Sequence, residues 1–164
     1  MFSPHDKQML LSQLLTLVAE EHETLVSAHR ASQKGATHEQ ARPENDKDTR
    51  ALEQSYLARG QAERVIQLKT DLDLLSALVL REPGHDPSVV LSALVHCQDE
   101  TGGESLYFLA PAGAGQTLTS SHGAVKVVTP RSPLGRALLG KRAHDEVEIG
   151  SPTGTRLLQV VWVG

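Results

Sequence analysis

The chain has 164 residues, of which 39% are hydrophobic and 22% are charged, and its formal net charge at pH 7 is -4. This composition is typical of a folded globular protein and excludes an extended disordered chain. The sequence has no apolar stretch of the roughly 20 residues that span a bilayer, so we expect no membrane partner. The negative charge also argues against duplex DNA as the main partner, because phosphate binding requires a surplus of Lys and Arg.

Two features of the sequence indicate the cytoplasm. Residues 1–6 carry neither the basic stretch nor the apolar core of a signal peptide. Cys97 is the single cysteine, so it cannot form an internal disulfide and fits a reducing compartment. We therefore expect a cytoplasmic protein in which Cys97 fills space in a strand as a small hydrophobic residue.

Residues 5–79 show a helical repeat of apolar positions that is interrupted once. In the first stretch the repeat consists of Leu11, Leu14, Val18, Leu25 and Ala28. In the second stretch it consists of Ala51, Ala58, Ala62, Val65, Leu68, Leu72 and Leu75. Narrow stripes of this spacing are typical of a two-stranded antiparallel coiled coil. The leucines gather at the open end of this hairpin, so its stability should decrease toward the tip.

The segment 35–48 interrupts the repeat and forms the predicted tip. Gly35 follows Lys34 and is expected to end the first helix as a C-cap. Pro43 cannot continue a helix, and the acidic and amide residues after it favour a new helix start. The segment is longer and more charged than the roughly 2–8 residues that usually connect two helices. We therefore place a helical hairpin at residues 1–80, with an acidic tip near residues 35–48.

The second half of the chain replaces the helical repeat with short β-branched runs, which follow a turn-rich linker at residues 82–87. The predicted strands are residues 88–96, 105–109, 124–129, 146–149 and 156–163. Between the third and fourth runs, Ser132 is expected to cap a short helix, with Pro133 at its first position and Gly140 after its end. Residues 86–164 are thus predicted to form a small, mainly antiparallel sheet with one short helix, which makes the chain an α+β protein.

Residues 125–141 (VKVVTPRSPLGRALLGK) and the segments after them resemble the C-terminal signature of the GreA/GreB family of bacterial transcription factors. The shared pattern is a strand, a Ser-Pro-hydrophobic-Gly-Arg-Ala-hydrophobic-hydrophobic-Gly-Lys helix, a second strand at 145–149 and a Pro-X-Gly hairpin at 152–154. The N-terminal half is similar to the family in shape, and Glu44-Asn45 match its tip sequence. The resemblance covers nearly the whole chain.

This resemblance implies an FKBP-like C-terminal domain and a monomeric accessory factor of RNA polymerase rather than an enzyme. In the family, the C-terminal domain sits on the rim of the polymerase secondary channel, and the coiled coil enters the channel and reaches the RNA 3′ end. Tip carboxylates help hold a second Mg²⁺ there, so that the polymerase hydrolyses backtracked RNA. By resemblance these roles fall to Glu44 and Asp46 as catalytic residues, with Asp48 as a further Mg²⁺ ligand, only in complex with polymerase. The factor would have no cofactor of its own and would share the Mg²⁺ of the polymerase active site.

The tip departs from the family pattern at Ala41. The family sequence there reads Asp, an apolar residue, any residue and then Glu-Asn, which places Ala41 at the Asp position. Two alternatives stay open: a neighbouring acid replaces the missing carboxylate, or the chain regulates polymerase through the secondary channel without cleavage.

A prolyl isomerase-like module is a further alternative, suggested by the FKBP-like fold. That class of enzyme binds proline in an aromatic-lined pocket, whereas the C-terminal domain has only Tyr107, Phe108 and Trp162. The polymerase-binding interpretation is therefore favoured.

Overall fold

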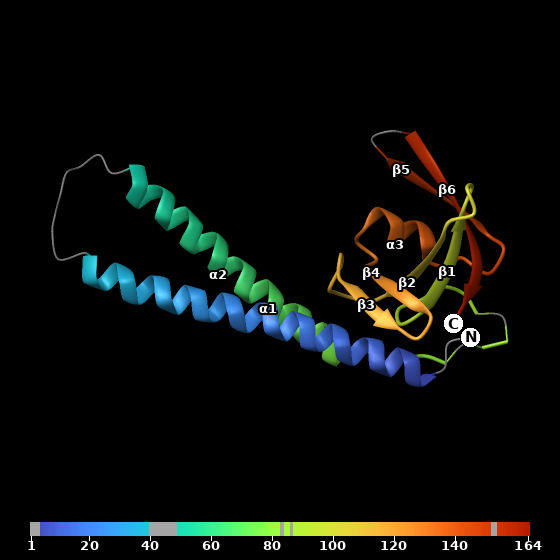
Figure 1. The fold of residues 1–164 in the computed structure, drawn as a ribbon, viewed down its shortest axis with the longest axis horizontal. Helices are drawn as coiled ribbons and strands as arrows, with labels where there is room; N and C mark the ends of the chain where they lie inside the picture. Colours follow the sequence, from blue (N-terminus) through green and yellow to red (C-terminus); the bar gives the residue numbers. More distant parts are fainter. Residues whose placement is uncertain (1–3, 40–48, 83, 86, 152–153) are drawn as a thin grey trace.

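The structure is a computed structural model that describes residues 4–39, 49–82, 84–85, 87–151 and 154–164 (Figure 1). Its elements in chain order are α1 (Pro4–Glu39), α2 (Thr49–Ser76), β1 (Leu94–Asp99), β2 (Glu104–Leu109), β3 (Thr117–Ser120), β4 (Gly123–Val128), α3 (Pro133–Leu138), β5 (Glu146–Ser151) and β6 (Gly154–Val163). The predicted fold class, a long helical hairpin followed by a small sheet with one short helix, is confirmed.

The two long helices run antiparallel and project from one side of the sheet. They lie close together beside the sheet and diverge with distance from it (Figure 1). Leu68 and Leu75 of α2 are fully buried near the sheet, whereas Ala28 and Ala58, farther out, are exposed. Because an alanine methyl group buries little apolar area, the outer part of the predicted seam provides little energy to hold the helices together.

The first helix is longer than the sequence predicted. The proposed C-cap at Gly35 is wrong, because α1 continues through this residue to Glu39. A glycine inside a helix costs only about 1 kcal/mol relative to alanine, and no helix-breaking residue follows before Glu39. The predicted helix break at Pro43 lies outside the described residues.

The short helix α3 has the predicted ends. The Ser132 hydroxyl accepts a hydrogen bond from the Gly135 backbone N–H at 3.0 Å, and Pro133 occupies the first turn. Gly140 has φ 76°, the left-handed conformation that a glycine adopts without strain. Gly135 itself is required, because a Cβ there would lie 2.0 Å from the Thr129 carbonyl oxygen.

The sheet has six strands in the order β3-β4-β2-β1-β6-β5, and all neighbours are antiparallel except the parallel pair β2 and β4. The strand β3 was not predicted from the sequence, because it is short and polar and only its Leu118 is buried. The first predicted strand, residues 88–96, begins too early. Ser92 has φ 74° and turns the chain, so β1 begins only at Leu94. Before that turn Val89 bonds to the end of α3 instead, where it accepts from the Gly140 N–H at 2.8 Å.

Two hydrophobic cores lie on opposite faces of the sheet, because successive strand residues point to opposite sides. The first core joins the base of the hairpin to the sheet and includes Leu10, Leu14, Val18, Leu68, Leu75, Leu94, Phe108, Leu118, Val125 and Val127. The second core lies around α3 and includes Val95, Cys97, Tyr107, Leu109, Leu138, Val147, Leu158 and Val160. Cys97 therefore fills space in a strand, as predicted, and its burial raises the pKa of the thiol to about 12.

We predict that truncation of Leu14 destabilises the whole protein. This side chain is fully buried between the hairpin and the sheet, so Leu14→Ala should lower the free energy of unfolding by about 2–5 kcal/mol. Leu57→Ala is the matched control, because Leu57 is 68% exposed on α2 and its truncation should change stability by no more than about 0.5 kcal/mol. Denaturant unfolding measures both values, and similar losses in the two variants would contradict the shared core.

Candidate functional site

The predicted tip lies between the two long helices. Ala41, Glu44, Asp46 and Asp48 fall within residues 40–48, which are outside the described residues. The helix ends that flank this segment lie at the end of the hairpin remote from the sheet (Figure 1). The roles assigned to these carboxylates remain predictions from the sequence.

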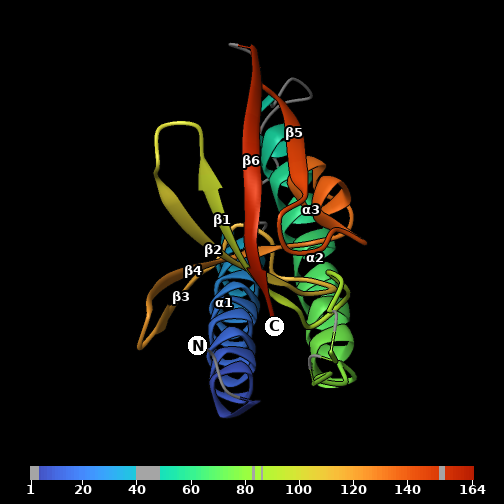
Figure 2. The same ribbon diagram turned by 90° about the vertical axis from the view of Figure 1, so that its right-hand side faces the viewer.

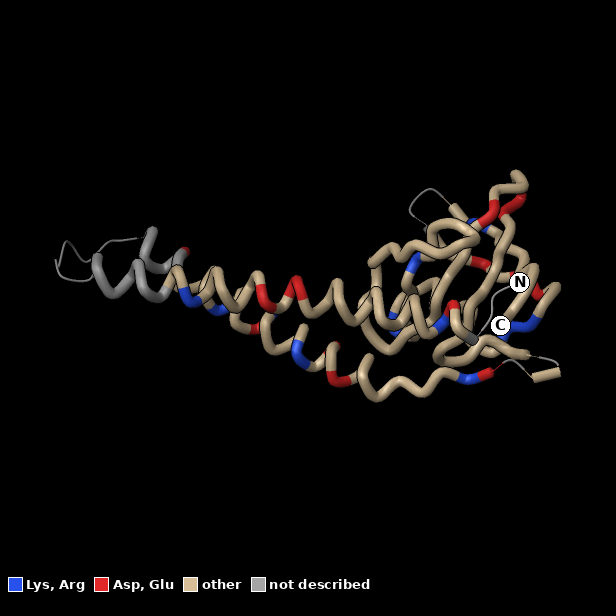
Figure 3. The backbone as a smooth tube through the Cα atoms, turned by 60° about the horizontal axis from the view of Figure 1, so that its bottom comes forward, with Lys and Arg blue, Asp and Glu red and all other residues tan. Residues whose placement is uncertain are grey.

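The described shaft of the hairpin has a mixed-charge surface (Figure 3). Arg64 Nη2 donates to Glu21 Oε1 at 2.7 Å and links the two helices. Two further ion pairs, Arg59–Glu63 and Lys69–Asp73, run along α2. All these side chains are exposed, so each pair contributes roughly 0–1 kcal/mol. Such a surface is suited to aqueous surroundings and differs from the basic stripe that binds duplex nucleic acid.

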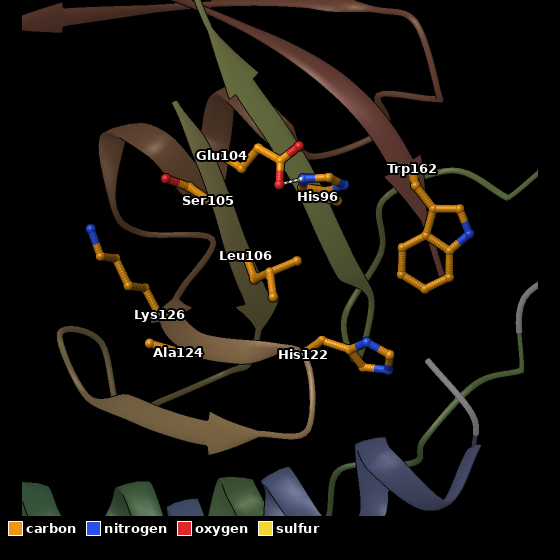
Figure 4. Close-up of a pocket in the computed structure, with 8 residues that line it drawn as sticks. All are labelled: His96, Glu104, Ser105, Leu106, His122, Ala124, Lys126 and Trp162. Carbon is orange, nitrogen blue, oxygen red and sulfur yellow. Dashed lines mark ion pairs between the residues drawn. The ribbon is translucent and has the colours of Figure 1, made fainter. Parts of the chain in front are cut away.

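A second candidate site is a hollow of about 770 Å³ in the sheet domain. The turns β1–β2 and β3–β4 project to the same side of the molecule (Figure 2). Residues of both hairpins and Trp162 of β6 line the hollow (Figure 4). Its lining residues are His96, Glu104, Ser105, Leu106, His122, Ala124, Lys126 and Trp162. The sequence analysis did not group these residues, because they come from strands whose order and register only the structure gives.

One row of neighbouring residues crosses the hollow from strand to strand. Trp162 of β6 is opposite His96 of β1, and His96 is opposite Leu106 of β2. His96 Nε2 also lies 3.6 Å from Glu104 Oε2, which forms an ion pair when the imidazole is protonated. Tyr107 is buried in the α3 core, on the opposite side of the sheet. Trp162 is thus the one Phe, Tyr or Trp among the described residues that line the hollow.

The Asp99 carboxylate fixes the turn between β1 and β2, beside the hollow. It accepts hydrogen bonds from the Thr101 hydroxyl at 2.6 Å, from the Thr101 N–H at 3.0 Å and from the Gly103 N–H at 2.8 Å. Arg156 of β6 adds an ion pair at 3.0 Å. These contacts, above all the bond from the Thr101 hydroxyl, lower the pKa of Asp99 to about 2, because they favour the ionised carboxylate.

None of the His, Cys, Asp and Glu side chains in the described part of the chain form a group of three or more that could hold a metal ion. None of the described helices is both long and apolar enough to cross a membrane.

Residues 85–164 match the family described as "Transcription elongation factor, GreA/GreB, C-term", which defines the sheet domain as the C-terminal part of a transcription factor. The chain is 31% identical over 120 residues to "Transcription inhibitor protein Gfh1" of Thermus thermophilus, covering 71% of this chain and 72% of that protein. It is 27% identical over 150 residues to "Transcription elongation factor GreA" of Zymomonas mobilis, covering 92% and 85%. The chain therefore belongs to the GreA/GreB family of transcription elongation factors.

Solved structures of the same family are also similar to this chain. The crystal structure of GreA factor homolog 1 (Gfh1) of Thermus thermophilus aligns over 92% of this chain and 94% of that chain, with 21% identity and a TM-score of 0.38. A GreA/GreB factor from Nitrosomonas europaea aligns over 58% of this chain and 78% of that chain, with 22% identity and a TM-score of 0.38.

We predict that Asp99 stabilises the fold in a pH-dependent way. Its pKa of about 2 lies below the ordinary value of about 3.9, so its contribution is present above the ordinary pKa and is lost as the pH falls toward 2. Asp99→Asn should therefore melt below the wild type at pH 7, and the difference should shrink between about pH 4 and pH 2. Glu100→Gln, an exposed acid in the same turn, is the control. A difference for Asp99→Asn that stays constant with pH would refute this assignment.

Proposed function

We propose that this chain acts in the cytoplasm as a monomer that binds RNA polymerase and inserts its helical hairpin into the secondary channel. There it would stimulate polymerase-catalysed cleavage of backtracked RNA. The main support for the proposal is that the helical hairpin projects from the sheet domain (Figure 1) and that the chain belongs to the GreA/GreB family. Helix α1 has 36 residues, and at about 1.5 Å per residue it extends over roughly 54 Å.

The two parts of the chain would have different tasks in the complex. The sheet domain would bind the rim of the channel, and the narrow hairpin would extend inward. Only the base of the hairpin is buried against the sheet, with Val18 the last fully buried residue of α1 among those described. About 21 residues of α1, or roughly 30 Å, follow Val18 and are available to enter a channel.

At the tip, Glu44 and Asp46 would act on the reaction, with Asp48 as a further ligand for Mg²⁺. Carboxylate oxygens are the hard ligands that Mg²⁺ prefers, and a second ion near the first can stabilise both the attacking and the leaving oxygen. The polymerase would remain the catalyst, and the ion would be shared with its active site. Two or three carboxylates alone bind Mg²⁺ weakly, so this site would form only within the complex with the RNA 3′ end.

A second candidate function is regulation of polymerase without cleavage. Two observations favour it: Ala41 occupies the position of the family Asp, and a relative with 31% identity is named a transcription inhibitor. In that case the hairpin would still enter the channel, and the remaining acids would hold the active centre in an unproductive state.

We predict that the sheet domain does not accelerate proline isomerisation. Among the described residues that line the hollow, Trp162 is the one Phe, Tyr or Trp, and the neighbouring Tyr107 and Phe108 are buried in opposite cores of the sheet. A peptide isomerisation assay with the full chain should give the uncatalysed rate. Acceleration at catalytic protein concentrations would show that the domain is an isomerase.

We predict that Glu44→Ala separates binding from cleavage. We expect this substitution at the predicted tip to alter stability by no more than about 0.5 kcal/mol and to leave polymerase affinity nearly unchanged. Cleavage of RNA in a stalled, backtracked elongation complex should fall at least tenfold. The matched control is Glu23→Ala, which removes the same charge from an exposed position on the shaft.

The same assay decides between the two candidate functions. If the wild type cleaves and Glu44→Ala cleaves equally well, the assignment of Glu44 is wrong. If the wild type binds polymerase but does not cleave, Ala41→Asp should restore cleavage when the missing carboxylate is the only defect. If Ala41→Asp also binds without cleavage, the chain is a non-cleaving regulator.

A further inference from the structure

The side chain of Gln13 joins α1 to the edge of the sheet through both ends of its amide. Gln13 Nε2 donates to the Thr119 carbonyl oxygen at 2.9 Å, and the Thr119 N–H donates to Gln13 Oε1 at 3.0 Å. Thr119 lies in β3, which is the last strand on this side of the sheet. The two residues are far apart in the sequence, so this contact ties the hairpin to the sheet domain.

Strand geometry explains why one amide can make both bonds. In a strand, the N–H and C=O groups of any one residue point to the same side. Successive residues point these groups alternately toward and away from a given neighbouring strand. Thr119 is opposite Ala124 of β4, and its backbone groups point away from β4, toward α1. An amide side chain presents one donor and one acceptor side by side, as the backbone of a further strand would. Gln13 thus takes the place of a neighbouring strand at an edge that would otherwise be open.

This contact adds directional bonds to the core beneath it. Leu14 and Leu118 bring α1 and β3 together in the shared core, where packing limits the angle of the helix although the hydrophobic effect itself is non-directional. Hydrogen bonds weaken steeply when they bend, so a pair of them resists rotation of the helix against the strand. Glu39 ends α1 at 26 residues beyond Gln13, or about 39 Å, so a rotation of about 5° at Gln13 would move that end by roughly 3 Å.

We propose that Gln13 is a positioning residue that sets the direction in which the hairpin projects from the sheet domain. The effect of Gln13 on activity rests on the proposed function. With the sheet domain docked on polymerase, the direction of the hairpin would decide where the tip carboxylates lie. Groups that act on a reaction lose effect when they are displaced by about 1 Å. A rotation of about 5° at Gln13 would move the end of α1 by roughly 3 Å, which is more than this.

The test measures the direction of the hairpin in the full chain. Spin labels are attached to cysteines introduced at Ser27 on α1 and Thr155 on β6, two exposed positions. Cys97 stays unlabelled, because it is fully buried. Ser27 lies about 21 Å beyond Gln13, so a rotation of about 10° would move it by roughly 4 Å, which pulsed dipolar spectroscopy resolves.

Two substitutions separate the hydrogen bonds from side-chain packing. Gln13→Glu keeps the size of the side chain but cannot donate to the Thr119 carbonyl when ionised, and Gln13→Ala removes both bonds. We expect both to shift or broaden the distance distribution, whereas Gln8→Ala, at an exposed glutamine of the same helix, should match the wild type. Unchanged distributions in both Gln13 variants, or a change in Gln13→Ala alone, would overturn the proposal.

A polymerase assay then tests the consequence. With an active wild type, Gln13→Glu should lower the maximal effect on a backtracked complex several-fold and leave the half-saturating concentration unchanged, since the sheet domain still docks. An equal maximal effect despite altered distances would overturn the positioning role. If the wild type does not act on polymerase at all, the proposed function fails, while the distances still decide whether Gln13 sets the direction.

Discussion

The helices α1 and α2 meet along a narrow seam of leucines and alanines. This seam has too little apolar surface to form a stable unit in water, because helix formation must be supported by tertiary packing. In this protein the sheet provides that packing. Leu10, Leu14 and Val18 of α1 and Leu68 and Leu75 of α2 are buried in a core that they share with one face of the sheet. The hairpin is therefore anchored at one end, and the rest of the molecule is arranged around that anchor.

The same anchor explains why the sheet has two different faces. One face receives the hairpin base and the other packs against α3, so the central strands β1 and β2 supply residues to two cores, whereas β3 and β5 at the edges alternate between a core and solvent. The hairpin covers only part of its face, and the hollow beside Trp162 and His96 lies where that cover ends. A long projecting shaft and a partly open sheet face are two consequences of one packing arrangement.

The sequence predicted best those features that depend on local chemistry. α3 was placed correctly because Ser132, Pro133 and Gly140 each act on their immediate neighbours. The end of α1 was misplaced because a single glycine has too small an energetic effect to stop a helix. β3 was missed because its residues resemble a polar loop, and its pairing with β4 becomes visible only in three dimensions. The hollow and the Gln13–Thr119 contact escaped prediction for the same reason, since they join segments distant in the sequence.

The distance between the anchor and the tip has a consequence for how such a protein can change its activity. The described part of α1 ends at Glu39, about 39 Å from Gln13, and the predicted tip follows it in the sequence. Substitutions in an exposed segment typically change stability by about 0.5 kcal/mol or less, whereas loss of a core leucine costs several times more. Substitutions on the described outer part of the hairpin, such as Leu57→Ala, are therefore expected to leave folding nearly unchanged, whereas substitutions at its base lower stability. Under the proposed function, a change of carboxylates at the tip would alter the chemistry while the base keeps the fold and the direction of the hairpin.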